Sequence, residues 1–170
     1  APGRFLDIAC GMGETVKEFA EHGWNTRGID ADMTMLPFHR ALGIQSDIGQ
    51  IELMDLPGRY DLIHISHAIY FIINPRQYLE SLHALLADRG LLCIVVADLM
   101  ASDDRGRPSY PHSFYPTAAS MGYLLGLSGF RVVGNRRISG SVYLAARPGG
   151  GPLPRVHPWL IRLGHLSKGL

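Results

Sequence analysis

Apolar runs and helical periodicities alternate along this chain of 170 residues. Short runs rich in β-branched and apolar residues predict strands, and segments with apolar residues three or four apart predict helices between them. The predicted strands are residues 4–9, 25–30, 44–47, 59–66, 91–97, 130–137 and 141–147. The predicted helices are residues 14–23, 31–43 with an interruption at Pro37, 48–54, 75–89 and 118–128.

Capping residues support two of these helices. Asn74 is a typical N-cap, and Pro75 follows it at the first helical position. We expect Leu79, Leu82 and Leu86 to share the buried face of this helix and Gly90 to end it. Thr117 is expected to cap the later helix, which ends near Gly129.

The alternation of strands and helices predicts an α/β fold, a doubly wound and mostly parallel seven-stranded sheet with helices on both faces. The continuous apolar run "LLCIVVA" is typical of a buried central parallel strand. The last two strands are joined only by "ISG", which is too short for a crossover helix. We therefore expect the last strand to be antiparallel.

The segment "RPGGGPLP" marks a domain boundary. We expect one domain over residues 1–147, followed by a linker and a C-terminal amphipathic helix over residues 148–170. Val156, Leu160 and Leu163 form its apolar face. Together with Trp159 they are too apolar to hang free, so we expect residues 155–166 to dock on the domain or on a neighbouring copy, forming a homodimer.

Composition narrows the classes of partner. Hydrophobic residues make up 46% and charged residues 18%, and the net charge is +1. This charge gives no electrostatic reason for a nucleic-acid or membrane partner, and no apolar run is long enough to span a bilayer. No signal peptide is expected. Cys10 and Cys93 fall in apolar strand or turn positions, so we expect reduced thiols and a cytoplasmic protein.

Polar residues follow the predicted strands at the edge where open α/β sheets bind ligands. The first strand runs into the glycine turn "CGMG", and Asp30, Asp47, Ser66 and Asp98 stand at later strand ends. Asp30 is placed to accept hydrogen bonds from a ribose diol, and Asp47 from the amine of adenine. Single aspartates there are often helix caps, but the full set with the turn favours a ligand site.

The turn differs from a dinucleotide fingerprint, because Val16 stands where the third glycine would be and Asp7 puts a carboxylate inside the first strand. The segments "LDIACGMG", "GIDADMTML", "QSDI", "YDLIHISHAIYFI" and "HALLADRGLLCIVVAD" resemble, in order, the motifs of Rossmann-like (class I) S-adenosylmethionine-dependent methyltransferases. "HSFYPTAASMGYLLGLSGFRVV" is similar to their small-molecule branch. The resemblance covers residues 4–147 and implies that S-adenosylmethionine binds and that S-adenosylhomocysteine is the product.

The resemblance also implies roles for individual residues. Asp7 and the backbone of Ala9, Cys10, Gly11 and Gly13 would hold the methionine part of the cofactor, and Asp30 the ribose. Ala31 would lie against the adenine, with Asp47 and Ile48 at its edge, and Ser66 and His67 would line the amino-acid end. The family usually has glycine where Ala9 stands. It also has one or two helices before the first strand, which are absent here.

Methyl transfer needs an aligned nucleophile and a group that takes its proton. We favour His112, on the loop after the fifth strand, as this base, with Tyr70, Tyr110 and Tyr115 as pocket walls. The sequence leaves open whether His67 lines the cofactor or acts as the base. For His64, inside a strand, a packing role is favoured.

Several other functions are disfavoured. The residues after the fourth strand, "SHAIYF", differ from the Asn/Asp-Pro-Pro-aromatic run of nucleobase amino methyltransferases. Neither cysteine is placed as a nucleophile, and no spacing predicts a metal site. A small-molecule acceptor attacked through O, N or C remains. The alternatives are a non-catalytic S-adenosylmethionine-binding module of a larger assembly, and a nucleotide-dependent oxidoreductase.

Overall fold

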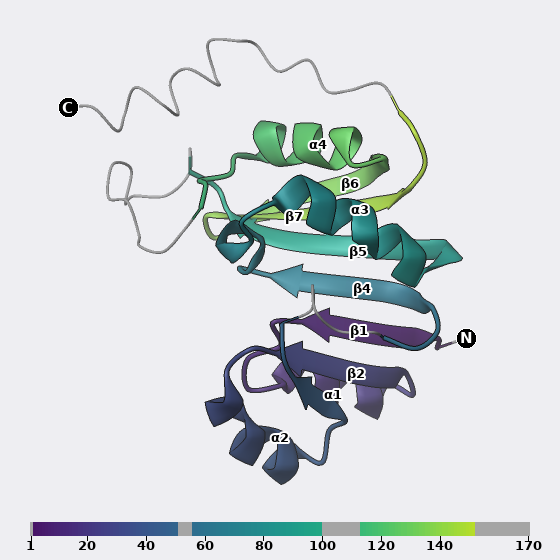
Figure 1. Cartoon of the computed structure of the whole chain (residues 1–170), viewed down its shortest axis with the longest axis vertical. Helices are drawn as coiled ribbons and strands as arrows, with labels where there is room; N and C mark the ends of the chain where they lie inside the picture. Colours follow the sequence, from purple (N-terminus) through teal and green to yellow (C-terminus); the bar gives the residue numbers. More distant parts are fainter. Residues whose placement is uncertain (1, 51–55, 100–112, 152–170) are drawn as a thin grey trace, which may run out of the picture.

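A single sheet organises the computed structural model, which describes residues 2–50, 56–99 and 113–151. The seven strands run in the order β3-β2-β1-β4-β5-β7-β6 (Figure 1). Their bounds are β1 Arg4–Ile8, β2 Asn25–Asp30, β3 Ser46–Ile48, β4 Tyr60–Ser66, β5 Leu86–Ala97, β6 Phe130–Ile138 and β7 Ser141–Pro148. β7 pairs antiparallel with both β5 and β6, and β1 to β5 pair in parallel. The predicted fold class, including the antiparallel last strand, is confirmed.

Helices cover both faces of the sheet. They are α1 Glu14–Glu21, α2 Leu36–Leu42, α3 Pro75–Leu85 and α4 Ala118–Leu127, with the 3₁₀ turns η1 Met33–Met35 and η3 Ile69–Phe71. Phe5 of β1 stacks on Phe19 of α1, with ring centroids 4.0 Å apart. The next residue, Leu6, points to the opposite face, because side chains alternate along a strand. There it joins the core formed with α3 and α4.

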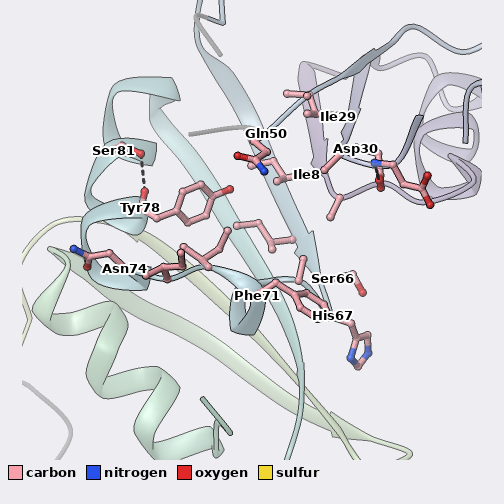
Figure 2. Close-up of a pocket in the computed structure, with 18 of the residues that line it drawn as sticks. Ile8, Ile29, Asp30, Gln50, Ser66, His67, Phe71, Asn74, Tyr78 and Ser81 are labelled. Carbon is pink, nitrogen blue, oxygen red and sulfur yellow. Dashed lines mark hydrogen bonds between the residues drawn. The ribbon is translucent and has the colours of Figure 1, made fainter. Parts of the chain in front are cut away.

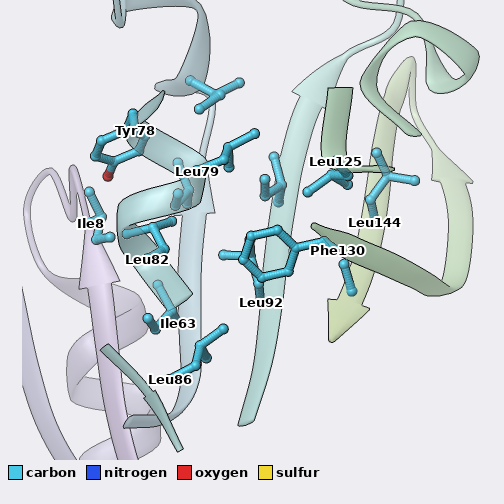
Figure 3. Packing of buried hydrophobic residues seen from close by; sticks show 14 of the residues in the cluster. Ile8, Ile63, Tyr78, Leu79, Leu82, Leu86, Leu92, Leu125, Phe130 and Leu144 are labelled. Carbon is cyan, nitrogen blue, oxygen red and sulfur yellow. The ribbon is translucent and has the colours of Figure 1, made fainter. Parts of the chain in front are cut away.

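The main core lies between the sheet and the helices α3 and α4 (Figure 3). Leu79 and Leu82 of α3 are fully buried, as is Leu125 of α4. Figure 3 shows the α3 leucines beside Ile8 and Ile63 of the strands. Each such side chain contributes about 1.5–3 kcal/mol when it is removed from water. This packing fixes α3 next to the carboxyl ends of β1 and β4.

The predicted helix starts of α3 and α4 are confirmed. The Asn74 side chain accepts the backbone N–H of Gln77 at 3.3 Å. Thr117 accepts the N–H of Ser120 at 3.1 Å, and the Ser120 hydroxyl accepts the N–H of Thr117 at 2.8 Å. This reciprocal capping satisfies two backbone donors at the start of α4.

The predicted end of α3 is wrong. The helix ends at Leu85, and Leu86 begins β5, where it pairs with Tyr60 and is 1% exposed. The register then jumps from Leu86 to Leu91, which makes a bulge. A Cβ on Gly90 would lie 2.9 Å from the Tyr60 carbonyl oxygen, so this glycine serves the bulge and not a helix end. The spacing of Leu79, Leu82 and Leu86 fits one face of a helix, but the pairing of Leu86 with Tyr60 places it in a strand.

Two further boundaries differ from the prediction. β3 covers residues 46–48 instead of 44–47, so Asp47 lies within it. The predicted helix 31–43 is divided into η1 and α2, and Pro37 lies in the first turn of α2, where its missing N–H costs nothing. Most of the predicted helix 48–54, the C-terminal helix and the docking of residues 155–166 lie outside the described residues, and the domain boundary stays a prediction.

Gly28 of β2 tests how tightly the turn after β1 packs on the sheet. A Cβ there would lie 2.8 Å from the Cys10 sulfur and 3.1 Å from Cγ2 of Val16. We expect Gly28→Ala to lower the free energy of unfolding by about 1–3 kcal/mol, because the close-packed neighbours must shift. Guanidinium denaturation measures the change.

Gly134→Ala in β6 is the matched control. A Cβ at Gly134 meets only the Ala145 Cβ at 3.9 Å, which is ordinary contact. We expect this variant to match or exceed the stability of the wild type, by up to about 1 kcal/mol, since alanine restricts the unfolded chain. Equal effects of the two substitutions would contradict the close packing at Gly28.

Candidate functional site

The glycine turn between β1 and α1 has an unusual backbone. Ala9, Gly11 and Gly13 have φ angles of 57°, 55° and 90°, in the left-handed region. Glycine adopts this region freely, whereas a residue with a Cβ pays roughly 1–2 kcal/mol. Ala9 therefore carries backbone strain, which explains why glycine suits this position. The turn is tied to β2 by the Cys10 N–H, which donates to the Ile29 carbonyl at 3.0 Å.

Asp30, at the end of β2, is held by two backbone donors. The Gly11 N–H donates to Oδ2 at 2.7 Å, and the Asp32 N–H donates to Oδ1 at 2.8 Å. Each carboxylate oxygen keeps a further lone pair for a ligand. Asp30 thus joins the glycine turn to the second strand and holds a carboxylate in one orientation at the sheet edge.

A cavity of about 800 Å³ opens at the carboxyl ends of β1, β2 and β4 (Figure 2). Its size is in the range of small-molecule and cofactor sites. Among the described residues that line it, the acids are Asp30, at the end of β2, and Asp32, just after it. The lining consists of Ile8, Ala9, Ile29–Asp32, Gly49, Gln50, Ile65–Ala68, Phe71–Asn74, Gln77, Tyr78 and Ser81.

The segment after β4 contributes His67, which also has a left-handed backbone, with φ of 52°. The ring Nδ1 of His67 lies 3.0 Å from the Tyr70 hydroxyl, and the backbone N–H of His67 donates to the Val95 carbonyl at 2.9 Å. Partial burial and, second, the charge of His64 lower the pKa of His67 below its usual range. The ring is therefore mostly unprotonated near pH 7 and able to accept a proton.

Tyr70 lies behind His67 and not in the cavity lining. The side chain is 6% exposed, and burial raises the pKa of its hydroxyl. The neighbouring residues Phe71 and Ile73 line the cavity instead, and Ile73 is 93% exposed. The pocket wall here is thus apolar and open to solvent. The predicted role of Tyr70 as a wall stays a prediction.

Asp7 forms a contact that the sequence analysis missed. It pairs in register with His64 of β4, and its Oδ1 lies 2.8 Å from Nδ1 of His64. Asp7 is 3% exposed and is not part of the cavity lining. This fold class places β1 between β2 and β4, so assuming that strand order would have suggested that Asp7 and His64 are neighbours.

Asp47 is also paired, with Arg27 of β2. The Arg27 Nε donates to Oδ2 of Asp47, and this hydrogen bond raises the pKa of the guanidinium further. Neither Asp47 nor Ile48 lines the cavity, whereas the following residues Gly49 and Gln50 do. Their predicted contacts with an adenine edge stay predictions.

Cys10 is a structural thiol. Burial, followed by the charges of Asp7 and Asp30, raises its pKa to about 12. The thiolate, which is the nucleophilic form, is therefore almost absent at neutral pH. Cys93 in β5 also has a raised pKa, because it is partly buried. Both cysteines are free thiols in the structure, and the expected reduced state stays a prediction.

The predicted acceptor side is partly outside the described residues, which exclude Tyr110 and His112. Ser113 directly follows His112, and its N–H and hydroxyl lie 2.6 and 2.7 Å from the Tyr70 carbonyl oxygen. Tyr115 is partly buried and does not line the cavity. The chain that follows His112 is therefore anchored beside the segment that carries His67.

Some lining residues gave no signal in the sequence. Gln50 follows β3, and Asn74, Gln77, Tyr78 and Ser81 come from the first two turns of α3. Asn74 was predicted only as a cap. Their place in the lining depends on how α3 packs against the sheet, as Figure 2 shows for Asn74, Tyr78 and Ser81.

Among the described residues, no group of three or more His, Cys, Asp or Glu side chains is arranged to hold a metal ion. In the same part of the chain, every helix is too short or too polar to cross a bilayer.

The comparisons with known proteins place this geometry in context. A model of the methyltransferase domain family matches residues 1–135. No curated protein matches the chain.

Solved structures share the fold at low sequence identity. An S-adenosylmethionine-dependent methyltransferase from Mesorhizobium loti has a TM-score of 0.72 at 18% identity, with 86% of this chain and 91% of that chain covered. The 1,6-didemethyltoxoflavin-N1-methyltransferase from Burkholderia thailandensis, with bound 1,6-didemethyltoxoflavin and S-adenosylhomocysteine, has a TM-score of 0.72 at 22% identity, covering 87% and 72%. The glycopeptide N-methyltransferase MtfA, complexed with S-adenosylmethionine, has a TM-score of 0.69 at 18% identity, covering 87% and 88%.

Because His67 is partly buried and lies near His64, we expect its NMR titration midpoint to lie below the ordinary value of about 6.5. His64→Gln should raise the midpoint, because it removes the charge that disfavours protonation of His67. It should not restore the ordinary value, because burial, the larger cause, remains.

The lowered pKa of His67 makes the stability of the folded protein depend on pH. The unfolded chain binds a proton at this histidine more readily than the folded one, so its contribution to stability is present above about pH 6.5. That contribution is lost as the pH falls toward the folded pKa. A midpoint at or above 6.5, or no response to His64→Gln, would show that His67 is not in this environment.

Proposed function

Because the chain belongs to the methyltransferase domain family, we propose that it moves a methyl group from S-adenosylmethionine to an O, N or C nucleophile of a small molecule. The observation that carries the proposal is the cavity above the glycine turn, with both oxygens of Asp30 oriented at its edge. The acceptor atom forms a bond to the methyl carbon, the carbon–sulfur bond breaks, and S-adenosylhomocysteine leaves. The acceptor's proton passes to a base or to water. The family match gives no support to the oxidoreductase alternative.

The residues present fit the cofactor. The two open lone pairs of the Asp30 carboxylate suit a ribose diol, and Ala31 in the cavity lining suits an adenine face. Ala9, Cys10, Gly11 and Gly13 supply a turn whose backbone a ligand can approach closely. Asp7 keeps its proposed place under the methionine part, where the pair with His64 holds its carboxylate.

Further proposed contacts complete the cofactor site. Asp47 and Ile48 lie at the adenine side, and Ser66 and His67 lie at the amino-acid end. Ser66 and His67 belong to the cavity lining. When bound, the cofactor supplies an activated methyl group on a sulfonium. The chain's own residues therefore need only to orient the acceptor, exclude water and receive a proton.

The acceptor is proposed to enter over Phe71 and Ile73, which form an apolar rim. Tyr70, Tyr110 and Tyr115 are proposed as walls of the acceptor side outside this lining. Two of the similar structures are named as methyltransferases of 1,6-didemethyltoxoflavin and of a glycopeptide, and this supports a small-molecule acceptor here. The net charge of +1 gives no support for a nucleic-acid or membrane partner. The homodimer and the cytoplasmic location stay predictions.

His112 is proposed as the base that takes the acceptor's proton, and His67 is the second candidate. His112 precedes Ser113, whose anchoring beside Tyr70 supports a position near the acceptor. For His67, the lowered pKa supports a ring that is ready to accept a proton near pH 7.

Asp30→Ala tests the cofactor site. Removing the partner of a desolvated charged hydrogen bond costs about 1.5–3 kcal/mol. We therefore expect S-adenosylhomocysteine to bind roughly tenfold to a hundredfold more weakly, measured by calorimetry. Asp61→Ala is the matched control, because Asp61 also accepts a backbone N–H, from Arg4 at 2.8 Å, outside the cavity lining. Unchanged affinity in a folded Asp30→Ala protein would overturn the ribose placement.

Turnover tests the function and its base. We expect the wild type to release S-adenosylhomocysteine from S-adenosylmethionine with at least one member of a panel of small phenols, amines and N-heterocycles. With that acceptor, His112→Asn should lower turnover by about a hundredfold to ten-thousandfold and leave cofactor affinity unchanged. His67→Asn, which tolerates the left-handed backbone, is measured beside it.

The outcomes separate the roles of the two histidines. A loss below about tenfold for His112→Asn, with a large loss for His67→Asn, would assign the base to His67. Loss of cofactor binding together with turnover would make His112 part of the cofactor site. A wild type that binds the cofactor and methylates no acceptor would favour the non-catalytic module.

A further inference from the structure

His39 of α2 lies directly beneath the glycine turn. The side chain is 1% exposed, and its Nε2 lies 2.7 Å from the Gly11 carbonyl oxygen. The Cys10 sulfur lies 3.8 Å from the same nitrogen. His39 is absent from the cavity lining, so it does not touch a ligand there. It reaches the cofactor site only through the turn.

The hydrogen bond defines the tautomer of His39. A carbonyl oxygen only accepts, so Nε2 must carry the proton. The other ring nitrogen, Nδ1, is buried and has no hydrogen-bond partner within the described residues. Burying an unpaired polar atom is unfavourable, and an apolar side chain would fill this space without that cost. The bond to Gly11 is therefore the contact that distinguishes histidine from a leucine here.

Both backbone groups of Gly11 are hydrogen-bonded, one to a residue of β2 and one to a residue of α2. Its N–H donates to Asp30 at the end of β2, and its carbonyl accepts from His39 of α2. The turn has little room to shift, since a Cβ on Gly13 would lie 2.2 Å from Cδ1 of Ile44 and 3.3 Å from Cδ2 of His39. The turn whose first residue, Ala9, lines the cavity is thus clamped from beneath.

We propose that His39 is a positioning residue that holds the glycine turn in its cofactor-binding conformation before the cofactor arrives. The proposal rests on the proposed function, since it concerns the affinity for that cofactor. A turn that is already ordered costs less to bind, because the ligand does not have to restrict it. Loss of the Nε2 donor should therefore weaken cofactor binding and leave turnover at saturating cofactor unchanged.

Three variants separate the hydrogen bond from packing. His39→Gln keeps an N–H donor at the position of Nε2, His39→Asn places its amide at the position of Nδ1, and His39→Leu has no donor. We expect S-adenosylhomocysteine to bind roughly threefold to tenfold more weakly to the Leu and Asn variants. The Gln variant should stay within about twofold of the wild type. The Km for S-adenosylmethionine should rise in the same order, with kcat unchanged.

His83→Leu is the matched control for loss of a histidine–carbonyl bond. Nε2 of His83 lies 2.8 Å from the Ser128 carbonyl oxygen, outside the cavity lining. This variant should lose stability and keep wild-type affinity. Equal affinities of wild type and a folded His39→Leu protein would overturn the proposal, and so would a Gln variant as weak as the Leu variant.

A second readout needs no cofactor. The Gly11 amide should exchange with solvent faster in His39→Leu than in the wild type or in His39→Gln, because the hydrogen bond that holds the Gly11 carbonyl is then lost. If the wild type binds no S-adenosylhomocysteine, the proposed function fails, and this exchange still decides whether His39 holds the turn. Unchanged exchange in His39→Leu would show that it does not.

Discussion

The hydrogen bond from the Gly11 N–H to the Asp30 carboxylate connects the parts on which the candidate site depends. It joins the turn after β1 to the end of β2, two strands that lie side by side in the sheet. Because the same carboxylate also accepts the Asp32 N–H, its orientation is set before any ligand binds. The strained backbone at Ala9 is tolerated because the turn is held at both ends, by β2 and by α1.

The second organising feature is the row of ionisable groups from β1 to the segment after β4. Asp7 contacts His64, burial and, second, the charge of His64 lower the pKa of His67, and His67 contacts Tyr70. The Asp7–His64 contact requires β1 and β4 to be neighbours with Asp7 opposite His64, whereas His64, His67 and Tyr70 lie close together in the chain. A shift of this register by one residue would move Asp7 to the other face of the sheet and break its contact with His64.

The core explains why the cavity is where it is. Leu79 and Leu82 of α3 pack on the sheet face opposite α1, and this places the first turns of α3 over the carboxyl ends of the strands. The apolar rim at Phe71 and Ile73 follows from the same placement, since these residues connect β4 to α3. Burial of apolar side chains thus builds the wall of the site, and the polar residues at strand ends supply its chemistry.

Local patterns in the sequence were enough to predict the order of strands and helices, the seven-stranded α/β sheet, the helix caps at Asn74 and Thr117, and the place of Asp30 and the glycine turn at one sheet edge. These features are local, because periodicity, capping and turn chemistry depend on residues close together in the chain. Packing of the folded chain was needed to reveal that Leu86 belongs to a strand, that Asp7 contacts His64, that Asp47 is paired with Arg27, and that His39 lies beneath Gly11. These pairs are 20 to 57 residues apart in the chain or depend on strand register. Their contacts arise from sheet pairing and core packing, which act between segments whose spacing in the sequence carries no signal.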